Sequence, residues 1–363
     1  MTGNWSEVVS RHWLREATVV PAAAPIGLSA AFGLTVEACA PFRAGTRFGA
    51  LPDVRFRAAD GVIRAPGELL PDAADQSFDG YLDRVRGCQL TVEQPLLLDF
   101  AHWSAVRDEL RALWRRVGWP SLSVVPELVA GDGESTVTAG ETHAELAWIL
   151  TGSLRTADGA AVSAGELLFR PAGRRAADTV DRCVMLRLRV PTDGRLAFVA
   201  VKDALAEALD ARRDGDAVPY VPVGETVRPV ARVAEEFREA VNSVVVERTL
   251  RVQAAKRWSA GGLEPVAPRP PASLTTGTRI RRTAEIARVP AGSDRWIWTV
   301  NGHGLPLSGR AGDRLLAELP LGREVGVGQL CDAMNAADRV DAVVRLLSAL
   351  YRLYAFELVG EGA

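Results

Sequence analysis

Lysine, histidine and cysteine are all scarce in this chain of 363 residues. Only two of the 43 basic residues are lysines, and the formal net charge is −2. A chain without an excess of positive charge is not expected to bind nucleic acid or an anionic membrane through bulk electrostatics. The four cysteines form no CxxC pair, which argues against a zinc ribbon or a disulfide framework; they are Cys39, Cys88, Cys183 and Cys331.

Long apolar runs are also missing. No stretch of about 18 or more apolar residues occurs, so no membrane-spanning helix is expected. The first residues show no basic region followed by an apolar one, and we therefore expect a cytoplasmic protein. The phosphate-binding loop, the dinucleotide GxGxxG turn, the HExxH zinc motif and the GxSxG nucleophile turn are absent as well.

The composition that remains is typical of a folded globular protein, with 48% hydrophobic and 24% charged residues. Residues 1–195 alternate short apolar runs with Gly- and Pro-rich turns, which predicts a β-rich domain carrying one amphipathic helix at 101–117. Helical, strongly charged patterns follow at 202–213 and 230–258, and we predict a helical segment over 196–262. A Pro-rich linker is expected at 263–273.

The C-terminal part, residues 274–363, has a pattern of its own. Strands are expected at 279–288 and 295–300, then helices at 313–319, 327–334 and 336–353, and a last strand at 355–359. This order is that of a winged-helix domain. Its third helix carries few arginines, so DNA binding is not expected and a protein-facing or structural role is favoured. The sequence Asn301-Gly302-His303-Gly304 is interpreted as a turn.

Two motifs lie between positions 137 and 189. Glu145 stands seven residues before Gly152, and Gly165 is followed by Pro171 and Gly173 in a G-x5-P-x-G pattern. Gly165 suits a turn into a strand, and the Pro and Gly of the second motif suit the turn that ends it. Both motifs resemble the paired motifs of the cupin superfamily.

The flanking sequence resembles one branch of that superfamily, the JmjC-like proteins related to bacterial ribosomal oxygenases. The segment from Val8 through Trp13 to Pro21 is similar to the opening helix of that branch. The resemblance implies an α+β fold with a double-stranded β-helix barrel, a helical dimerisation segment and a C-terminal winged-helix domain, assembled as a homodimer. It also implies Fe(II)- and 2-oxoglutarate-dependent hydroxylation of protein side chains, with iron held by His-x-Asp and a distal His.

The iron ligands of the family are not all present. Alignment of the motifs puts Ala139 at the first His, Glu141 at the Asp and Ala176 at the distal His. An alanine cannot bind a metal, and no histidine lies between His143 and His303. The favoured interpretation is a divergent member that lacks the iron site, needs no cofactor and binds a protein or peptide.

An alternative interpretation is that the chain is still an enzyme. Residues 139, 141, 143 and 145 share one face of a strand, and if that face is the inner one, Glu141 and His143 both point into the barrel. With Asp178 or Asp181 they would form an unusual metal site for Fe(II), and the chain would be a hydroxylase with rearranged ligands. The opposing interpretation is that Glu141 and His143 form a hydrogen-bonded polar pair in a partly solvated cavity.

An arginine would bind the 2-oxoglutarate carboxylate in such an enzyme. The resemblance places this role near Arg155, whose guanidinium fork matches a carboxylate. Arg170, Arg174 and Arg175 are a second basic group, either an anion-attracting rim of the barrel or solvated surface charge.

Overall fold

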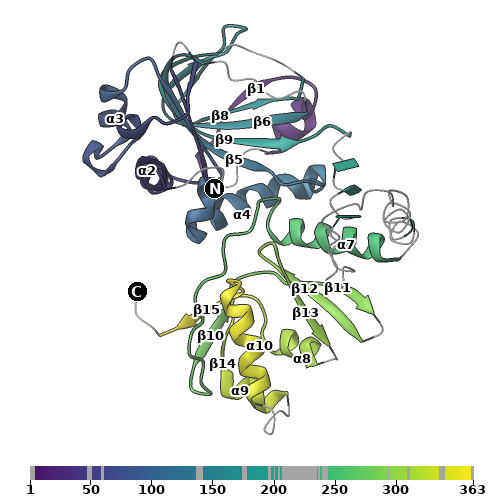
Figure 1. Ribbon diagram of the computed structural model, residues 1–363. Helices are drawn as coiled ribbons and strands as arrows, with labels where there is room; N and C mark the ends of the chain where they lie inside the picture. Colours follow the sequence, from purple (N-terminus) through teal and green to yellow (C-terminus); the bar gives the residue numbers. More distant parts are fainter. Residues whose placement is uncertain are drawn as a thin grey trace, which may run out of the picture. The chain divides into compact units, whose positions relative to one another are not determined.

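The computed structural model describes residues 5–46, 51–58, 61–135, 142–173, 178–194, 198–199, 201–202, 205–206, 235, 238, 244–292, 294–308, 311–334 and 340–360. Its contacts divide the chain into two compact units (Figure 1). The first is Met1–Leu196 with Gly261–Val266, and the second is Ala197–Ala260 with Ala267–Ala363. The four-part division expected from the sequence stays a prediction.

A large antiparallel sheet organises the first unit. Its nine strands run in the order β1-β8-β6-β9-β5-β4-β2-β3, with β7 paired to β6. Gly165 and Gly173, which flank β8, have φ of +88° and +84°, a backbone conformation that favours glycine, so the predicted turns are confirmed. The strands are β1 Thr18–Pro21, β2 Asp53–Ala58, β3 Gly61–Ile63, β4 Gln89–Glu93, β5 Val125–Ser135, β6 His143–Arg155, β7 Ala161–Ser163, β8 Glu166–Arg170 and β9 Asp178–Pro191.

Helices cover parts of this sheet. The amphipathic helix expected at 101–117 is confirmed as α4, Phe100–Val117, which starts where the Asp99 side chain accepts a hydrogen bond from the His102 amide at 2.8 Å. The N-terminal helical turns bring the Trp5 ring edge-on to Trp148 of β6, 6.2 Å between centroids. The other helical segments are α1 Trp5–Glu7, η1 Val8–His12, α2 Leu28–Arg43, η2 Gly67–Leu69, η3 Ala73–Asp75, α3 Phe78–Arg84 and η4 Pro95–Leu98.

A short segment from later in the chain also packs in the first unit. The indole N–H of Trp103 donates to the carbonyl of Glu264, and that of Trp114 donates to the carbonyl of Gly261, each at 2.8 Å. The Val124 amide donates to Gly262 at 2.8 Å. Buried indole N–H groups need such partners, so residues 261–266 complete the surroundings of α4.

The second unit contains two small antiparallel sheets, ordered β14-β10-β15 and β11-β12-β13. The predicted turn is confirmed: Asn301 and Gly302, with φ of 48° and 86°, connect β12 to β13. His303 begins β13, a strand that the sequence did not predict. The elements are α7 Val244–Ser259, β10 Arg279–Arg282, β11 Ala287–Gly292, β12 Arg295–Val300, β13 His303–Ser308, α8 Ala311–Glu318, β14 Glu324–Gly326, α9 Val327–Ala333, α10 Val340–Arg352 and β15 Phe356–Val359.

The three C-terminal helices and the last strand match the sequence expectations within a few residues. α7 occupies the end of the helical pattern expected at 230–258, while most of 230–243 and most of 202–213 lie outside the described residues. α10 buries Val343, Leu347 and Leu350 at helical spacing against the core of this unit. None of the described helices combines the length and the apolar character that crossing a bilayer requires.

Arg269, in the part of the predicted linker that belongs to the second unit, is held by side-chain contacts. Its guanidinium lies over the Tyr351 ring, 3.4 Å from the centroid, and its Nε donates to the Tyr351 carbonyl at 2.6 Å. Nη2 donates to the carbonyl of Phe356. Residue 269 is therefore anchored to α10 and β15.

Candidate functional site

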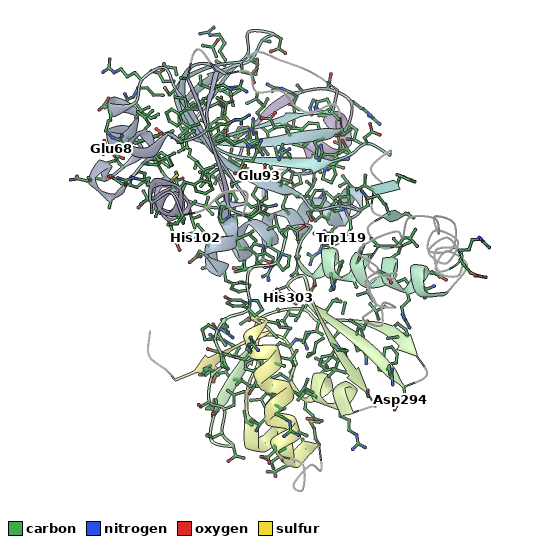
Figure 2. The ribbon with its side chains drawn as sticks, viewed as in Figure 1. Glu68, Glu93, His102, Trp119, Asp294 and His303 are labelled. Carbon is green, nitrogen blue, oxygen red and sulfur yellow. The ribbon has the colours of Figure 1, made fainter. Side chains whose placement is uncertain are left out.

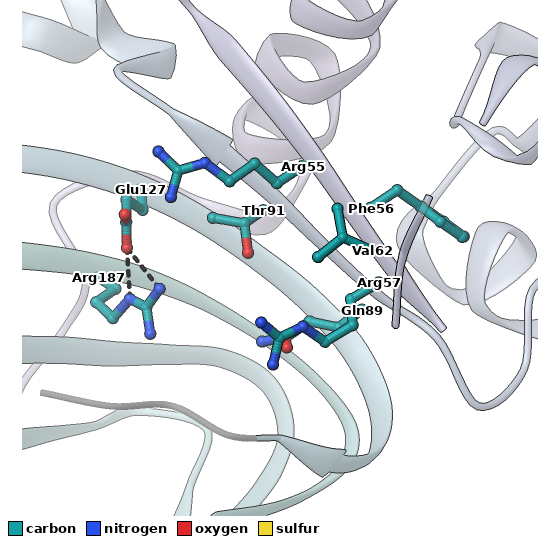
Figure 3. A pocket seen from close by; sticks show the side chains of 8 residues that line it. All are labelled: Arg55, Phe56, Arg57, Val62, Gln89, Thr91, Glu127 and Arg187. Atoms are coloured by element: carbon teal, nitrogen blue, oxygen red, sulfur yellow. Dashed lines mark hydrogen bonds and ion pairs between the residues drawn. The ribbon is translucent and has the colours of Figure 1, made fainter. Parts of the chain in front are cut away.

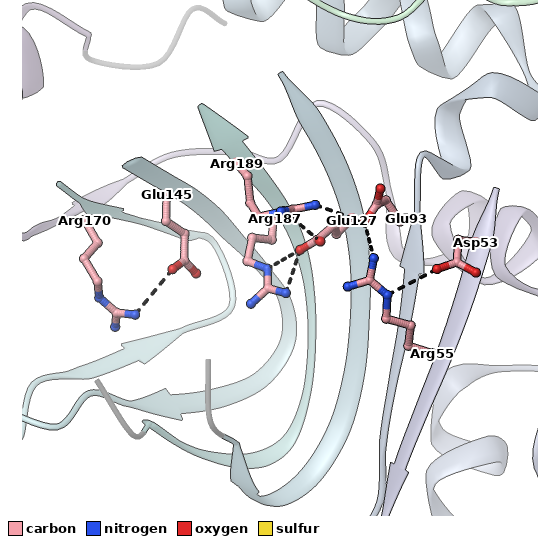
Figure 4. A network of polar contacts seen from close by, with 8 residues as sticks. All are labelled: Asp53, Arg55, Glu93, Glu127, Glu145, Arg170, Arg187 and Arg189. Atoms are coloured by element: carbon pink, nitrogen blue, oxygen red, sulfur yellow. Dashed lines mark hydrogen bonds and ion pairs between the residues drawn. The ribbon is translucent and has the colours of Figure 1, made fainter. Parts of the chain in front are cut away.

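Charged side chains gather on one face of the large sheet. Strand register places Glu127 of β5 beside Arg187 of β9, Arg189 beside Glu145 of β6, and Glu145 beside Arg170 of β8. Because side chains alternate along a strand, all of these point to the same side. Figure 4 shows the strands bending around them. We call the following residues the polar face: Asp53, Arg55, Glu93, Glu127, Glu145, Arg170, Arg187 and Arg189.

Two residues of the polar face, Arg170 and Glu145, form an almost wholly buried cluster with Asp178. Arg170 Nη2 donates to Asp178 Oδ2 at 2.8 Å, and Nη1 lies 3.4 Å from Glu145 Oε2. Their side chains are between 0% and 4% exposed. The cluster contains one guanidinium and two carboxyl groups, so its positive charge is engaged by both acids.

Burial governs the ionisation of these two acids. It raises the pKa of Glu145, against the opposing influence of the Arg187 and Arg170 guanidiniums. It likewise raises the pKa of Asp178, against the charge and the hydrogen bond of Arg170. Glu145 Oε1 finds no hydrogen-bond partner among the described residues.

A second cluster extends the network toward β2. Glu127 is 2% exposed and accepts from Arg187 Nε at 2.6 Å, while its other oxygen lies 2.9 Å from Arg189 Nε. Arg189 Nη2 reaches Glu93 at 3.0 Å, and Arg55 Nη2 reaches the same carboxylate at 2.7 Å. Each acid in this chain of contacts therefore bridges two arginines.

His143 lies on the same face, at the start of β6. Its Nδ1 is 2.9 Å from the Thr142 hydroxyl. Burial lowers the pKa of His143 and the Arg189 charge lowers it further, while Glu127 acts in the opposite direction. The imidazole is thus neutral near pH 7.

A small pocket of about 170 Å³ opens beside the polar face (Figure 3). Figure 3 shows the Arg187–Glu127 ion pair at one side of it and the Arg57 and Gln89 side chains at another. Its lining consists of Arg55, Phe56, Arg57, Val62, Gln89, Thr91, Glu127 and Arg187. Three of these eight residues are arginines and one is acidic; Arg187 is paired with Glu127, and Arg55 with Asp53 and Glu93.

The structure places the residues expected from the sequence in different surroundings. Glu141, Ala139 and Ala176 lie outside the described residues. His143 is on the polar face as described above. Arg155 ends β6 and is exposed, opposite Ala161 of β7 and Thr179 of β9.

The remaining groups singled out in the sequence are also located. Asp178 is buried against Arg170, while Asp181 is exposed. Arg170, considered as part of a rim, is buried in the network, and Arg174 and Arg175 lie outside the described residues. His102 lies on α4 of the first unit and His303 on β13 of the second (Figure 2).

We tested whether the described residues fit the iron of the resembled family. No three His, Cys, Asp or Glu side chains among them come close enough to hold a metal ion. The buried carboxyl groups of Glu145 and Asp178 already contact a guanidinium. A facial triad of two imidazoles and one carboxylate therefore does not fit the described part of this face.

Sequence reasoning missed most of the polar face. Arg55, Glu93, Glu127, Arg187 and Arg189 stand on four strands and carry no motif. The sequence pattern that could have indicated this face is the alternation of charged and apolar residues in β9, where Arg187 and Arg189 interrupt the buried run at every second position.

Comparison with known proteins places the fold. No family model matches the chain, and no curated protein matches its sequence. Solved structures of the ribosomal oxygenase YcfD from Escherichia coli do match. One has 15% sequence identity and a TM-score of 0.51, with 99% of each chain covered.

Two further structures of the same protein agree. YcfD in complex with cobalt and succinic acid and YcfD in complex with cobalt and 2-oxoglutarate each have 16% identity and a TM-score of 0.53, with 99% of both chains covered. The resemblance seen in about 50 residues of sequence thus extends, at the level of the fold, over nearly the whole chain. The chain has a mixed α and β fold, with one large and two small antiparallel sheets, that is similar to the fold of the ribosomal oxygenase YcfD.

Proposed function

We propose that this chain is a divergent JmjC-like protein that binds a protein or peptide and lacks the iron site of its family. In this proposal the large sheet is the double-stranded β-helix barrel, residues 196–262 form a helical dimerisation segment, and residues 274–363 form a winged-helix domain. The protein would act as a cytoplasmic homodimer. The observation that carries the proposal is the arginine network of the polar face.

The argument is electrostatic. Two of the described acids that point inward, Glu145 and Asp178, already contact Arg170 in a buried site. A guanidinium about 4 Å from a further unit charge repels it by roughly 4 kcal/mol at an effective dielectric constant of about 20, which offsets the attraction of one carboxylate at that distance. A metal ion would therefore have to displace Arg170 from the two carboxyl groups that it already contacts.

An Fe(II)- and 2-oxoglutarate-dependent hydroxylase with rearranged ligands is the second candidate. It is favoured by His143, whose lowered pKa keeps the imidazole in the neutral form that binds metals. It is also favoured by the fold, since YcfD has been solved with cobalt and 2-oxoglutarate. In this candidate Glu141 joins His143 as a ligand and Arg155 holds the cosubstrate carboxylate.

Metal binding separates the two candidates. The purified full chain is titrated anaerobically with Fe(II) and 2-oxoglutarate, and metal content and the charge-transfer absorption band are measured. We expect neither stoichiometric iron nor the band. Stoichiometric iron with the band, reduced by substitution of Glu141 or His143, would establish the hydroxylase instead.

A peptide-binding measurement tests the positive half of the proposal. A displayed random peptide library is selected on the immobilised chain in metal-free buffer without 2-oxoglutarate, with heat-unfolded protein as the control. We expect enrichment of a shared motif whose synthetic peptide binds without any change in mass. Absence of an enriched motif, or a gain of one oxygen atom on adding Fe(II) and 2-oxoglutarate, contradicts the binding module.

A further inference from the structure

We propose that the outer edge of β3 binds an extended segment of a partner protein as an added strand, with one apolar side chain of that segment in a pocket beside the edge. β3 is the last strand of the large sheet, and within the described part of the chain it pairs with β2 alone. This site rests on the peptide-binding half of the proposed function, because it gives the bound peptide a place and a conformation.

The edge of β3 offers backbone groups that another extended chain can pair with. Residues of a strand in an antiparallel sheet point their N–H and C=O groups alternately toward one neighbour and toward the other side. Some of the backbone groups of β3, Gly61–Ile63, therefore point away from β2. The opposite end of the sheet is less suited to strand addition, because β1 ends in Pro21, which has no N–H.

An apolar pocket of about 210 Å³ lies beside this edge. We call it the edge pocket, and its apolar lining residues are Phe42, Val54, Val62, Ile63, Pro66 and Leu70. It is smaller than the roughly 300–1,000 Å³ of sites for drug-sized ligands. Side chains of an added strand alternate between the two faces of the sheet, so one apolar side chain can enter the pocket while its two neighbours stay outside.

The apolar surface at this edge is uncovered. Val62 is 57% exposed beside its cross-strand neighbour Arg57 (Figure 3). Leu69, next to the pocket residue Leu70, is 40% exposed. Strand edges that avoid pairing carry charged residues, prolines or bulges, and β3 has none of these. β3 has only three residues and allows few backbone hydrogen bonds, so part of the affinity has to come from the edge pocket.

The charges around the edge pocket indicate which partner sequence fits. Asp53 and Arg55 also line the pocket and are paired with each other at 3.2 Å. Arg64, which follows β3 and lines the pocket, is exposed and has no ion pair with another described residue. Glu68 is exposed as well but does not line the pocket. An acidic residue near the apolar one in the partner segment would therefore face Arg64.

The test uses a symmetric probe, Ac-Glu-Thr-Val-Thr-Val-Thr-Glu-NH2, which presents alternating valines and an acidic end in either strand direction. Its binding to the full chain is followed by ligand-observed NMR in metal-free buffer without 2-oxoglutarate. Two N-methylated forms are compared with it, one methylated at the valine amides and the other at the threonine amides. In an added strand one set of amides faces β3 and the other faces away. We expect one form to bind about tenfold or more weakly than the parent probe, and the other to bind like the parent.

Three substitutions locate the binding. Val62→Lys places a charge on the open edge, and we expect it to weaken binding of the parent probe about tenfold or more. Leu14→Lys is the matched control, because Leu14 is 50% exposed and precedes β1 at the other end of the sheet, and it should leave binding unchanged. Arg64→Gln should abolish the preference of the chain for the parent probe over its Gln-ended form, which we expect to be about threefold.

Several results overturn the inference. The parent probe does not bind, or both N-methylated forms bind alike, or Val62→Lys has no more effect than Leu14→Lys. Self-association of the chain in sedimentation that Val62→Lys abolishes also overturns it, because a second copy would then cover the edge. The N-methylated probes need no protein variant, so the first two results are decisive even if Val62→Lys is poorly folded.

Failure of the proposed function is a separate result. A library-selected peptide that binds the wild type and Val62→Lys equally would refute strand addition at β3 and leave the peptide-binding module standing. Stoichiometric iron with the charge-transfer band would refute the proposed function. Strand addition at β3 would still hold in that case if the metal-free protein distinguishes the two N-methylated probes.

Discussion

Replacing Arg170 by methionine tests the buried cluster directly. The substitution keeps an unbranched apolar side chain but removes the cation that contacts Glu145 at 3.4 Å and Asp178 at 2.8 Å. Breaking a buried ion pair from one side costs about 3–5 kcal/mol, because the remaining charge is left in a medium of low polarity. A typical domain is stable by only about 5–15 kcal/mol, so the loss should be large.

The loss should depend on pH, with a sign that the pKa shifts determine. Glu145 has a folded-state pKa above its ordinary value of 4.5, so its contribution to stability is full below pH 4.5 and is lost as the pH rises through the folded pKa. Asp178, whose pKa is also raised, behaves in the same way. Removing Arg170 raises both pKa values further. The loss of stability of the variant relative to the wild type should therefore be largest at pH 7, and the two stabilities should become similar near pH 4.

The assay must report on the first unit alone, because a chain of two units need not unfold in one step. Hydrogen exchange of peptides from β6 and β8, read by mass spectrometry in increasing urea, gives the free energy of opening there. Arg155→Met is the control, since Arg155 is exposed at the end of β6, and its effect should stay within about 0.5 kcal/mol. A deficit for Arg170→Met below this size at pH 7, or one that does not change with pH, would refute the reasoning.

Three other perturbations have defined outcomes. Gly152→Ala should destabilise the first unit by about 3 kcal/mol or more in urea unfolding, because φ is +72° and the new Cβ would lie 2.5 Å from a carbonyl oxygen of β9. Gly159→Ala is the control: its φ is +91°, but no atom lies within 4 Å of the new Cβ, so it should cost only about 1–2 kcal/mol. Arg269→Ala should cost about 2–4 kcal/mol and speed hydrogen exchange in β15, because two hydrogen bonds to carbonyls and a ring contact disappear. The thiols of Cys39 and Cys183, whose pKa burial raises to about 12, should resist iodoacetamide at pH 8 until urea unfolds the chain.

Each of these outcomes can be contradicted by a simple result. Equal effects of the two glycine substitutions would show that the carbonyl approach at Gly152 relaxes freely. An unchanged exchange rate in β15 would show that Arg269 does not anchor its segment. Labelling of Cys39 or Cys183 at the rate of a free thiol would show that the native fold leaves that sulfur accessible.

Much of the local structure was predictable from residue spacing. The 3.6-residue apolar period predicted α4, and the small C-terminal helices followed the same rule. Gly165 and Gly173 predicted turns because their backbone conformation disfavours a side chain. β13 was not predicted, because Gly304 and Pro306 lower its β propensity. In the structure, pairing with β12 over six residues compensates for this low propensity.

The candidate site was predictable only in part. His143 was expected to share a strand face with Glu145, and the register of β6 confirms this, although the direction of that face was left open by the sequence. Glu145 was used as a motif position, and nothing in its local sequence indicated that Arg170 would neutralise it 25 residues later. The family ligand positions were identified by alignment, and their surroundings lie outside the described residues.

The sequence by itself determined the turns, the amphipathic helices, the distribution of charge and the resemblance to the ribosomal oxygenases, because each depends on residues close together in the chain. Only the tertiary structure decided that Arg55, Glu93, Glu127 and Arg187 form one network, since they come from strands β2, β4, β5 and β9. A shift of strand register by one residue would move such side chains to the opposite face. The chemistry of this face therefore depends on strand pairing over long sequence distances, which no local pattern specifies.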